Sequence, residues 1–214
     1  IPLGVGKAMK HGESFDLISS VLVFIGYAIP AFALGMLLKM LFCGTTEGFL
    51  DLLPATGFKS QNYASLSSFG KVKDIASHML LPLICYISGN FALLTMLMKN
   101  SLLEEINSDY VRTVYAKGGS TSRALWGHAL RNALIPVSTG FGSILTVMFA
   151  GSVIIERVFE IPGMGSLSLE AIVSRDYPVF MGILALTSVL GLLGNVLSDF
   201  CYVIIDPRIN FDKA

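Results

Sequence analysis

Charge is what this sequence has least of. Only 14% of its 214 residues are Asp, Glu, Lys or Arg, whereas 53% are hydrophobic, and soluble domains average about 25% charged residues. The 15 basic and 15 acidic side chains cancel, which argues against a protein that holds nucleic acid by neutralising its phosphates. The composition is also too apolar for a disordered segment. What remains is a chain whose surface is not built to face water.

Cysteines and phosphate-binding motifs are scarce as well. The three cysteines lie far apart without a C-x-x-C pair, so they predict neither a disulfide framework nor a zinc site. The three histidines, His11, His78 and His128, share no metal-binding spacing. There is no G-x-x-x-x-G-K-S/T string, which a P-loop needs to hold phosphates. The sequence therefore predicts no catalytic residue, no metal site and no cofactor site on this chain.

An initiator Met and a secretory leader are also lacking. No basic first segment precedes an apolar one, as it would in a signal peptide. Residues 1–6 read instead like the tail of an apolar segment that is cut part-way. We therefore expect residues 1–214 to be an N-terminally truncated piece of a single longer domain.

Long apolar runs are what the sequence does have. A helix needs about 20 mostly apolar residues to cross a bilayer, and four stretches reach this length, at about 17–40, 79–98, 132–155 and 177–205. Pro30, Pro82 and Pro136 lie inside these stretches or near their ends, and membrane helices tolerate proline. Core helices of a large soluble protein are the alternative, which four such runs in 214 residues disfavour. The sequence predicts an all-α integral membrane protein with four spans in this fragment.

The distribution of Lys and Arg predicts the orientation, because basic residues gather in cytoplasmic loops. With four spans, both ends of the chain and the 99–131 loop share one side. That side carries nine basic residues, and the other side carries five. We therefore expect both ends and the 99–131 loop to face the cytoplasm, although the bias is moderate and the inverted topology stays open.

The 99–131 loop is the most polar part of the chain. Residues 110–117 have a helical pattern, which Gly118-Gly119-Ser120 interrupts, with Ser120 or Thr121 as the N-cap of a second helix. That helix, at about 122–131, gathers Ala124, Leu125, Ala129 and Leu130 on one face. It could lie in the lipid interface or dock in the groove of a soluble partner. Composition alone favours the interface.

Specific strings in this loop resemble a known family. Residues 110–120 read YVRTVYAKGGS and residues 128–136 read HALRNALIP, which resembles the cytoplasmic EAA loop of binding-protein-dependent ABC importers, in the dipeptide and oligopeptide branch. Further motifs of this family match in the same order over nearly the whole chain: residues 28–32, Glu156, Phe159, 162–165, 175–179, Asp199, Tyr202 and 206–209. Within the branch, residues 25–32, 91–97, 174–179 and 206–211 are most similar to the Yej-type peptide permeases. The sequence departs from the EAA pattern at Arg112, Thr113 and Val114, and has Arg131 where a proline often ends the motif.

The resemblance implies a fold and partners. The family has six spans, so two N-terminal ones would be missing here. It implies a multi-pass subunit of the bacterial inner membrane that is not itself an enzyme. Its partners would be a second permease subunit, ABC ATPase subunits that bind ATP and Mg, a periplasmic or lipid-anchored solute-binding protein, a peptide substrate and membrane lipid, but no nucleic acid. It also favours docking of the 121–131 helix on the ATPase over a position in the lipid interface.

The resemblance further implies two sets of functional residues. The first set would couple the permease to the ATPase through the 110–132 loop: Arg112, Ala116, Lys117, Gly118, Ser122, Leu125, Trp126, His128, Leu130 and Arg131. Gly118 would allow the sharp turn from which the second helix projects. The second set would form an outer gate or a docking surface for the binding protein: Glu156, Phe159, Pro162, Gly163, Gly165, Arg175, Asp176 and Tyr177. An ordinary connector remains the alternative for residues 161–165.

Three polar residues lie within the predicted spans: Asn90, Asn195 and Asp199. An acid inside a membrane is a functional hypothesis by default, but Asp199 lies near the end of its span, which favours a structural role. We expect the two asparagines to bond between helices rather than to line the transport path.

Other functions stay open at this point. A permease for another solute of the peptide and nickel branch would carry the same motifs. An intramembrane enzyme would need a cluster of ionisable groups at bilayer depth, where Asp199 stands alone. A membrane scaffold would explain the spans but not the ordered importer motifs.

Overall fold

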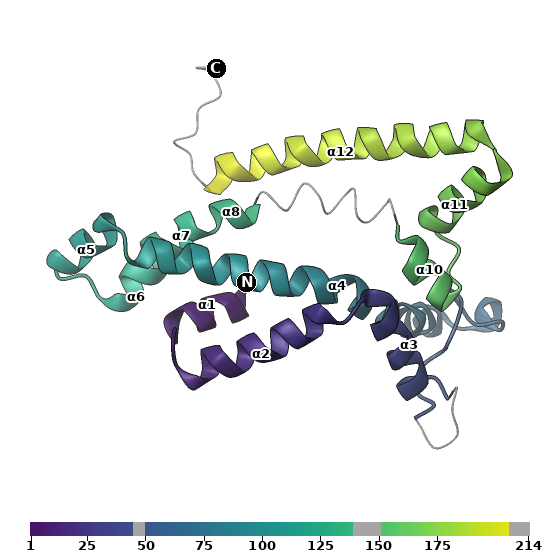
Figure 1. The fold of residues 1–214 in the computed structure, drawn as a ribbon, viewed down its shortest axis with the longest axis horizontal. Coiled ribbons are helices and arrows are strands. Elements are labelled where there is room, and N and C mark those ends of the chain that lie inside the picture. Colours follow the sequence, from purple (N-terminus) through teal and green to yellow (C-terminus); the bar gives the residue numbers. More distant parts are fainter. Residues whose placement is uncertain (45–49, 139–150, 206–214) are drawn as a thin grey trace. The chain divides into compact units, whose positions relative to one another are not determined.

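The regular structure of the chain is helical. The computed structural model describes residues 1–44, 50–138 and 151–205, and these residues form no β-strand, which confirms the predicted all-α class (Figure 1). The elements in order are α1 (Pro2–Met9), α2 (Ser14–Ala28), α3 (Ala31–Phe42), the 3-10 helix η1 (Tyr63–Ser65), α4 (Ser68–Ile106), α5 (Asp109–Ala116), α6 (Thr121–Ala124), the π-helix η2 (Leu125–Ala129), α7 (Leu130–Ala133), α8 (Ile135–Ser138), α10 (Val153–Phe159), α11 (Met164–Ser174) and α12 (Tyr177–Ile205).

Two helices are long and apolar enough to cross a membrane, α4 with 39 residues and α12 with 29. The predicted span 79–98 lies inside α4, and the predicted span 177–205 has the bounds of α12. One face of α12 presents large apolar side chains at four-residue intervals, since Leu192, Val196 and Phe200 are 66, 65 and 63% exposed. Contact of such an apolar face with lipid tails is favourable, whereas its exposure to water is not. The length and composition of these helices support the predicted membrane protein.

The predicted span at 17–40 is not one straight helix. α2 and α3 are separate helices that meet at an angle of 97°, so the described residues contain two spans, or three if this bent pair is one span, instead of four. The break falls at Ile29 and Pro30, because proline has no N–H to donate and disfavours the helical conformation of the residue before it. Pro82, by contrast, lies inside α4 without ending it.

Half of the predicted span at 132–155 falls on residues 139–150, which lie outside the described residues. On one side of them the chain forms α7 and α8, and on the other side it forms α10. The final match of the importer motifs, residues 206–211, also lies outside the described part.

The chain falls into two compact units, each described by itself. The first comprises residues 1–24, 91–148 and 187–214, and the second comprises residues 25–90 and 149–186. The core of the first unit joins α1, the end of α4, and the helices from α5 to α8, with these buried residues: Val5, Ala8, Met98, Leu102, Val111, Ala124, Leu125, Ala129, Ala133 and Val137. Gly4 permits a close approach to α4, because a Cβ there would lie 2.7 Å from the Thr95 carbonyl oxygen.

A buried ion cluster joins three helices of the first unit. The Asp16 carboxylate, on α2, accepts hydrogen bonds of 2.8 Å at both oxygens from Lys99 Nζ, on α4. Lys7 Nζ, on α1, lies 3.2 Å from Asp16 Oδ1. The backbone N–H of Gly12 and the ring of His11 each approach Asp16 Oδ2 to 3.2 Å. Buried charges are costly unless they are paired and hydrogen-bonded, and Asp16 meets both conditions.

Lys7 is fully buried, with 0% of its surface exposed. Besides its contact with the carboxylate, its ammonium donates to the Asp16 carbonyl at 3.0 Å, to Ser19 Oγ at 3.0 Å and to Ser20 Oγ at 2.6 Å. These oxygens replace the water that the ammonium loses on burial. The hydroxyl groups of α2 therefore supply the remaining hydrogen-bond acceptors of the Lys7 ammonium.

The core of the second unit includes Leu81, Cys85, Ile155, Phe159 and Cys43. α3 packs against α10, and Lys39 Nζ donates to the Val158 carbonyl at 2.8 Å. Gly35 makes this contact close, because a Cβ there would lie 3.2 Å from the Phe159 ring.

We predict that Asp16→Ala lowers the unfolding temperature of the detergent-solubilised protein by several degrees, because it leaves the buried ammonium groups of Lys7 and Lys99 without a counter-charge. Differential scanning fluorimetry would measure the change. Asp109→Ala is the matched control, since its pair with Arg112 is exposed, with 97 and 72% of the two side chains accessible, and exposed pairs contribute little. Equal melting of the two variants would contradict the role of the cluster.

Candidate functional site

The 99–131 loop folds much as its sequence predicts. The helix expected at 110–117 is α5, Asp109–Ala116. Gly118 follows with φ of +80°, in the left-handed region that favours glycine. Ser120 is the N-cap of the next helix, and its Oγ accepts a hydrogen bond of 3.3 Å from the Arg123 N–H. The second helix runs on through α6, η2 and α7, and its predicted apolar face is the buried one.

The π-helical turn at 125–129 is a feature that the sequence reasoning missed. A π-helix bonds residue i to residue i+5, and the apolar pairs Ala124–Ala129 and Leu125–Leu130 are five residues apart. Five residues make about 1.4 turns of an α-helix, so an α-helix would not align them on one side. The five-residue spacing was the available signal. The turn brings Ala124 and Ala129, both 0% exposed, into the same core.

The structure divides the predicted coupling residues into an inner and an outer group. Leu125 is 5% exposed and Leu130 is partly buried, and both pack in the core of the chain itself. Leu125 therefore packs within the chain itself, on the inner side of the loop. Trp126 is 57% exposed. The other exposed members are Arg112, Ala116, Lys117, Gly118, Ser122, His128 and Arg131.

Specific hydrogen bonds anchor both ends of this loop. Arg131 Nε donates to the Ile205 carbonyl at 2.7 Å, which places a cation at the carboxyl end of α12. Ser101 Oγ donates to the Ala133 carbonyl at 3.0 Å and so joins α4 to α7. The Tyr110 hydroxyl donates to the carboxylate of Glu105. Burial and this hydrogen bond raise the pKa of Tyr110, so the phenol keeps its proton.

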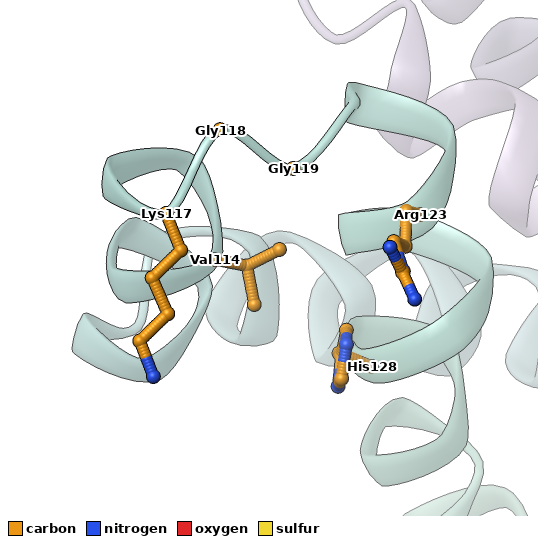
Figure 2. Close-up of a pocket in the computed structure, with 6 residues that line it drawn as sticks. All are labelled: Val114, Lys117, Gly118, Gly119, Arg123 and His128. Carbon is orange, nitrogen blue, oxygen red and sulfur yellow. The ribbon is translucent and has the colours of Figure 1, made fainter.

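A cavity of about 340 Å³ opens between α5 and the helix that follows the Gly118–Gly119 turn (Figure 2). Its lining residues are Val114, Lys117, Gly118, Gly119, Arg123 and His128. Gly119 is needed here for space, because a Cβ would lie 2.6 Å from Val114 Cγ1 and 2.8 Å from the Val114 carbonyl oxygen.

The outer segment, residues 156–176, is organised around Glu156. This side chain is buried, and its Oε1 accepts hydrogen bonds of 3.1 Å from the N–H groups of Ser152 and Gly165. Its Oε2 accepts one of 2.6 Å from the Ser166 N–H. Gly165 and Ser166 lie in the first turn of α11, whose N–H groups have no partner within the helix. Glu156 therefore caps α11 from another helix.

Glycine makes room for the Glu156 carboxylate. A Cβ at Gly163 would approach Glu156 Oε1 to 2.6 Å, and a Cβ at Gly165 would approach the Val153 backbone nitrogen to 2.6 Å. The structure thus brings together Glu156, Gly163 and Gly165. Phe159 is buried in the core of its unit, and Pro162 is exposed.

The turn into α12 contains the remaining outer residues. Arg175 ends α11 in the left-handed conformation, with φ of +58°. Asp176 Oδ1 accepts a hydrogen bond of 3.2 Å from the Val179 N–H and so caps α12. Tyr177 is 67% exposed. Arg175 and Asp176 therefore shape the turn as well as facing outward.

The polar residues of the spans lie mostly at the surface of the described structure. Asn90 is exposed, and its amide nitrogen lies 3.4 Å from the Tyr86 carbonyl of the same helix. Asn195 and Asp199 are exposed on α12. The buried bond between helices comes instead from Ser198, whose Oγ donates to the Ser138 carbonyl at 3.0 Å. The described residues contain no group of three or more His, Cys, Asp or Glu that could hold a metal ion.

Comparisons with known proteins agree over nearly the whole chain. A family model of binding-protein-dependent transport system inner membrane components matches residues 1–211. The inner membrane ABC transporter permease protein YejB of Escherichia coli O157:H7 is 45% identical over 213 residues, covering 99% of this chain and 58% of that protein. The peptidoglycan transport system permease protein YejB of Agrobacterium fabrum is 42% identical over 214 residues, covering 100% and 58%.

A more distant relative is the dipeptide transport system permease protein DppB of Escherichia coli K12. It is 35% identical over 225 residues, covering 100% of this chain and 66% of that protein. The chain therefore spans 58% of the length of the two YejB proteins that it matches.

We predict that Gly165→Ala destabilises the protein by about 1–3 kcal/mol, the usual cost of an extra carbon in a tightly packed site. The clash is with the backbone of Val153, which cannot turn away as a flexible side chain can. Gly182→Ala is the matched control, because nothing lies within 4 Å of a Cβ there. Denaturant titration in detergent would measure both, and an equal or smaller loss for Gly165→Ala would contradict the tight packing.

Proposed function

Because the chain belongs to the family of binding-protein-dependent transport system inner membrane components, we propose that it is the permease part of an ABC importer that takes up peptides across the bacterial inner membrane. The observation that carries this proposal is the loop from α5 to α7, which displays Trp126 and several cations on a well-packed base at the end of α4. The names of the E. coli relatives, an ABC transporter permease and a dipeptide permease, support the substrate class.

The coupling step follows from how the loop is packed. A separate ATPase subunit binds ATP and Mg and hydrolyses the ATP, and it docks on the exposed side of the loop in the cytoplasm. Ala129 and Ala133 are 0% exposed in the core that includes Met98 and Leu102 of α4. A displacement of the loop therefore moves the end of α4 with it, since packed helices shift as bodies. The Arg131 bond to Ile205 passes the same displacement to α12.

The opposite side of the membrane receives the substrate. A periplasmic or lipid-anchored solute-binding protein docks on residues 156–176, and a second permease subunit completes the pathway. The Glu156 bonds to the first turn of α11 support this role, because they give the segment a fixed shape. Pro162, Arg175 and Tyr177 are exposed on it.

Peptidoglycan-derived solutes are the second candidate substrate class. The observation in favour is the name of the Agrobacterium fabrum relative, a peptidoglycan transport permease, at 42% identity. Uptake assays with short peptides and with peptidoglycan fragments, in cells with and without the gene, would separate the two classes.

We predict that Trp126→Asp removes the ATPase from the complex. The protein would be expressed in the membrane with the products of its neighbouring genes and purified through a tag on this subunit. Trp126 is 57% exposed, so a charge there disturbs docking without disturbing the core. Phe69→Asp, at a residue that is 80% exposed on the first turn of α4, is the control. Absence of any ATPase from the wild-type preparation would count against the importer.

A second variant tests transmission rather than docking. Gly118→Val forces a β-branched residue into a left-handed conformation at φ of +80°, so the loop has to rearrange at its turn. We expect the ATPase to remain bound and to hydrolyse ATP while peptide uptake falls by about tenfold or more, as for a misplacement of a working group by about 1 Å. Gly89→Ala, in α4 with open space around it, should keep normal uptake. Wild-type uptake by Gly118→Val would contradict the coupling role of this turn.

A further inference from the structure

The cavity beside the Gly118–Gly119 turn has an unusual charge balance. Lys117, Arg123 and His128 line it, and no acidic residue does (Figure 2). Figure 2 shows the nitrogen-bearing ends of Arg123 and His128 close together on one side, with Lys117 on the other. None of the three forms an ion pair within the described ranges of the chain.

The acidic residues of the same loop are directed elsewhere. Glu105 accepts the hydrogen bond of the Tyr110 hydroxyl, and Asp109 pairs with Arg112 at 3.4 Å. Glu104 is exposed and does not line the cavity. A carboxylate that fills this cavity would therefore come from outside this part of the chain.

The position of the cavity favours a soluble partner over a lipid. The charge-free run of α4 ends before Lys99, and the helix continues to Ile106. These eight residues add about 12 Å to the helix, whereas each headgroup layer is about 5–8 Å thick. α5 and the helices after it pack on this protruding end. The residues that line the cavity thus belong to the polar stretch after the charge-free run of α4, which favours a soluble partner over a lipid.

We propose that this cavity receives an acidic side chain of the ATPase partner. This inference rests on the function proposed above and names the chemistry of that docking site. Arg123 offers a planar fork that matches a carboxylate, and Lys117 offers a flexible point charge. Val114 provides an apolar wall for the methylene groups of an incoming Glu or Asp. The volume of about 340 Å³ accommodates a whole side chain rather than a lone ion.

The test compares ATPase affinity as a function of salt. The complete permease would be reconstituted in nanodiscs, and binding of its purified ATPase subunits would be titrated at about 0.05 M and about 0.5 M salt, over which the Debye length falls from above 10 Å to below 8 Å. We expect the double variant Lys117→Gln, Arg123→Gln to bind about tenfold more weakly at low salt, as for the loss of close charge pairs across an interface. The difference should shrink at high salt.

Two further variants make the result interpretable. The charge-preserving exchange Lys117→Arg, Arg123→Lys should retain most of the affinity. The matched control Lys10→Gln, Arg157→Gln removes two exposed cations outside the cavity and should bind as the wild type does. All variants would first be checked for an unchanged melting temperature, which is expected because Lys117 and Arg123 are exposed.

The outcomes separate this inference from the proposed function. No binding by the wild-type protein at either salt concentration would overturn the importer proposal itself. Wild-type binding with equal affinity and equal salt dependence for the Gln variant would overturn only the acidic contact. Loss of phosphatidylglycerol adducts by the Gln variant in native mass spectrometry, with unchanged ATPase affinity, would assign the cavity to a lipid and overturn it as well.

Discussion

The first unit depends on the carboxylate of Asp16, which holds Lys7 and Lys99 out of water at one end of the apolar helices. A bilayer offers no water to an unpaired charge or backbone group, so a charged side chain beside an apolar span needs partners within the protein. Asp16 finds them in two ammonium groups, an N–H and a ring nitrogen. The cluster fixes α1 and α2 to α4 at Lys99, where α4 leaves its apolar run. The helices that follow, up to Ala133, pack on the end of α4 that this cluster holds in place.

The same constraint organises the second unit with another residue. Glu156 is buried, and its carboxylate accepts three backbone N–H groups, two of them from the first turn of α11. Here the carboxylate replaces the partners that a helix start lacks, and glycine at 163 and 165 provides the space. The Asp16 carboxylate pairs mainly with Lys side chains, and the Glu156 carboxylate accepts hydrogen bonds from backbone N–H groups. Each fixes the position of a helix by providing a partner for groups that water cannot reach.

Local signals were readable from the sequence, and long-range ones were not. The bounds of α12, the left-handed Gly118 and the Ser120 cap follow from composition and short spacings, and the two YejB relatives confirm the Yej-type resemblance. The bend at Pro30 was missed because proline is tolerated within membrane helices, as Pro82 shows. The Asp16–Lys99 pair spans 83 positions of sequence, and no local pattern encodes such a contact. Glu156 was identified as a functional residue, but its role as the cap of α11 needed the fold.

The division of the loop into an inner and an outer face changes which residues can carry recognition. A helix that docks on a partner must still pack on its own protein, and the π-turn assigns Ala124, Leu125 and Ala129 to that packing. Trp126 and the exposed cations lie on the outer side of the loop, where the proposed partner would dock. Arg112 stands at a position where the EAA pattern has an acid, and its charge is already balanced by Asp109. Lys117 and Arg123 form no ion pair among the described residues, and they line the cavity together with His128. This is the observation behind the acidic contact proposed above.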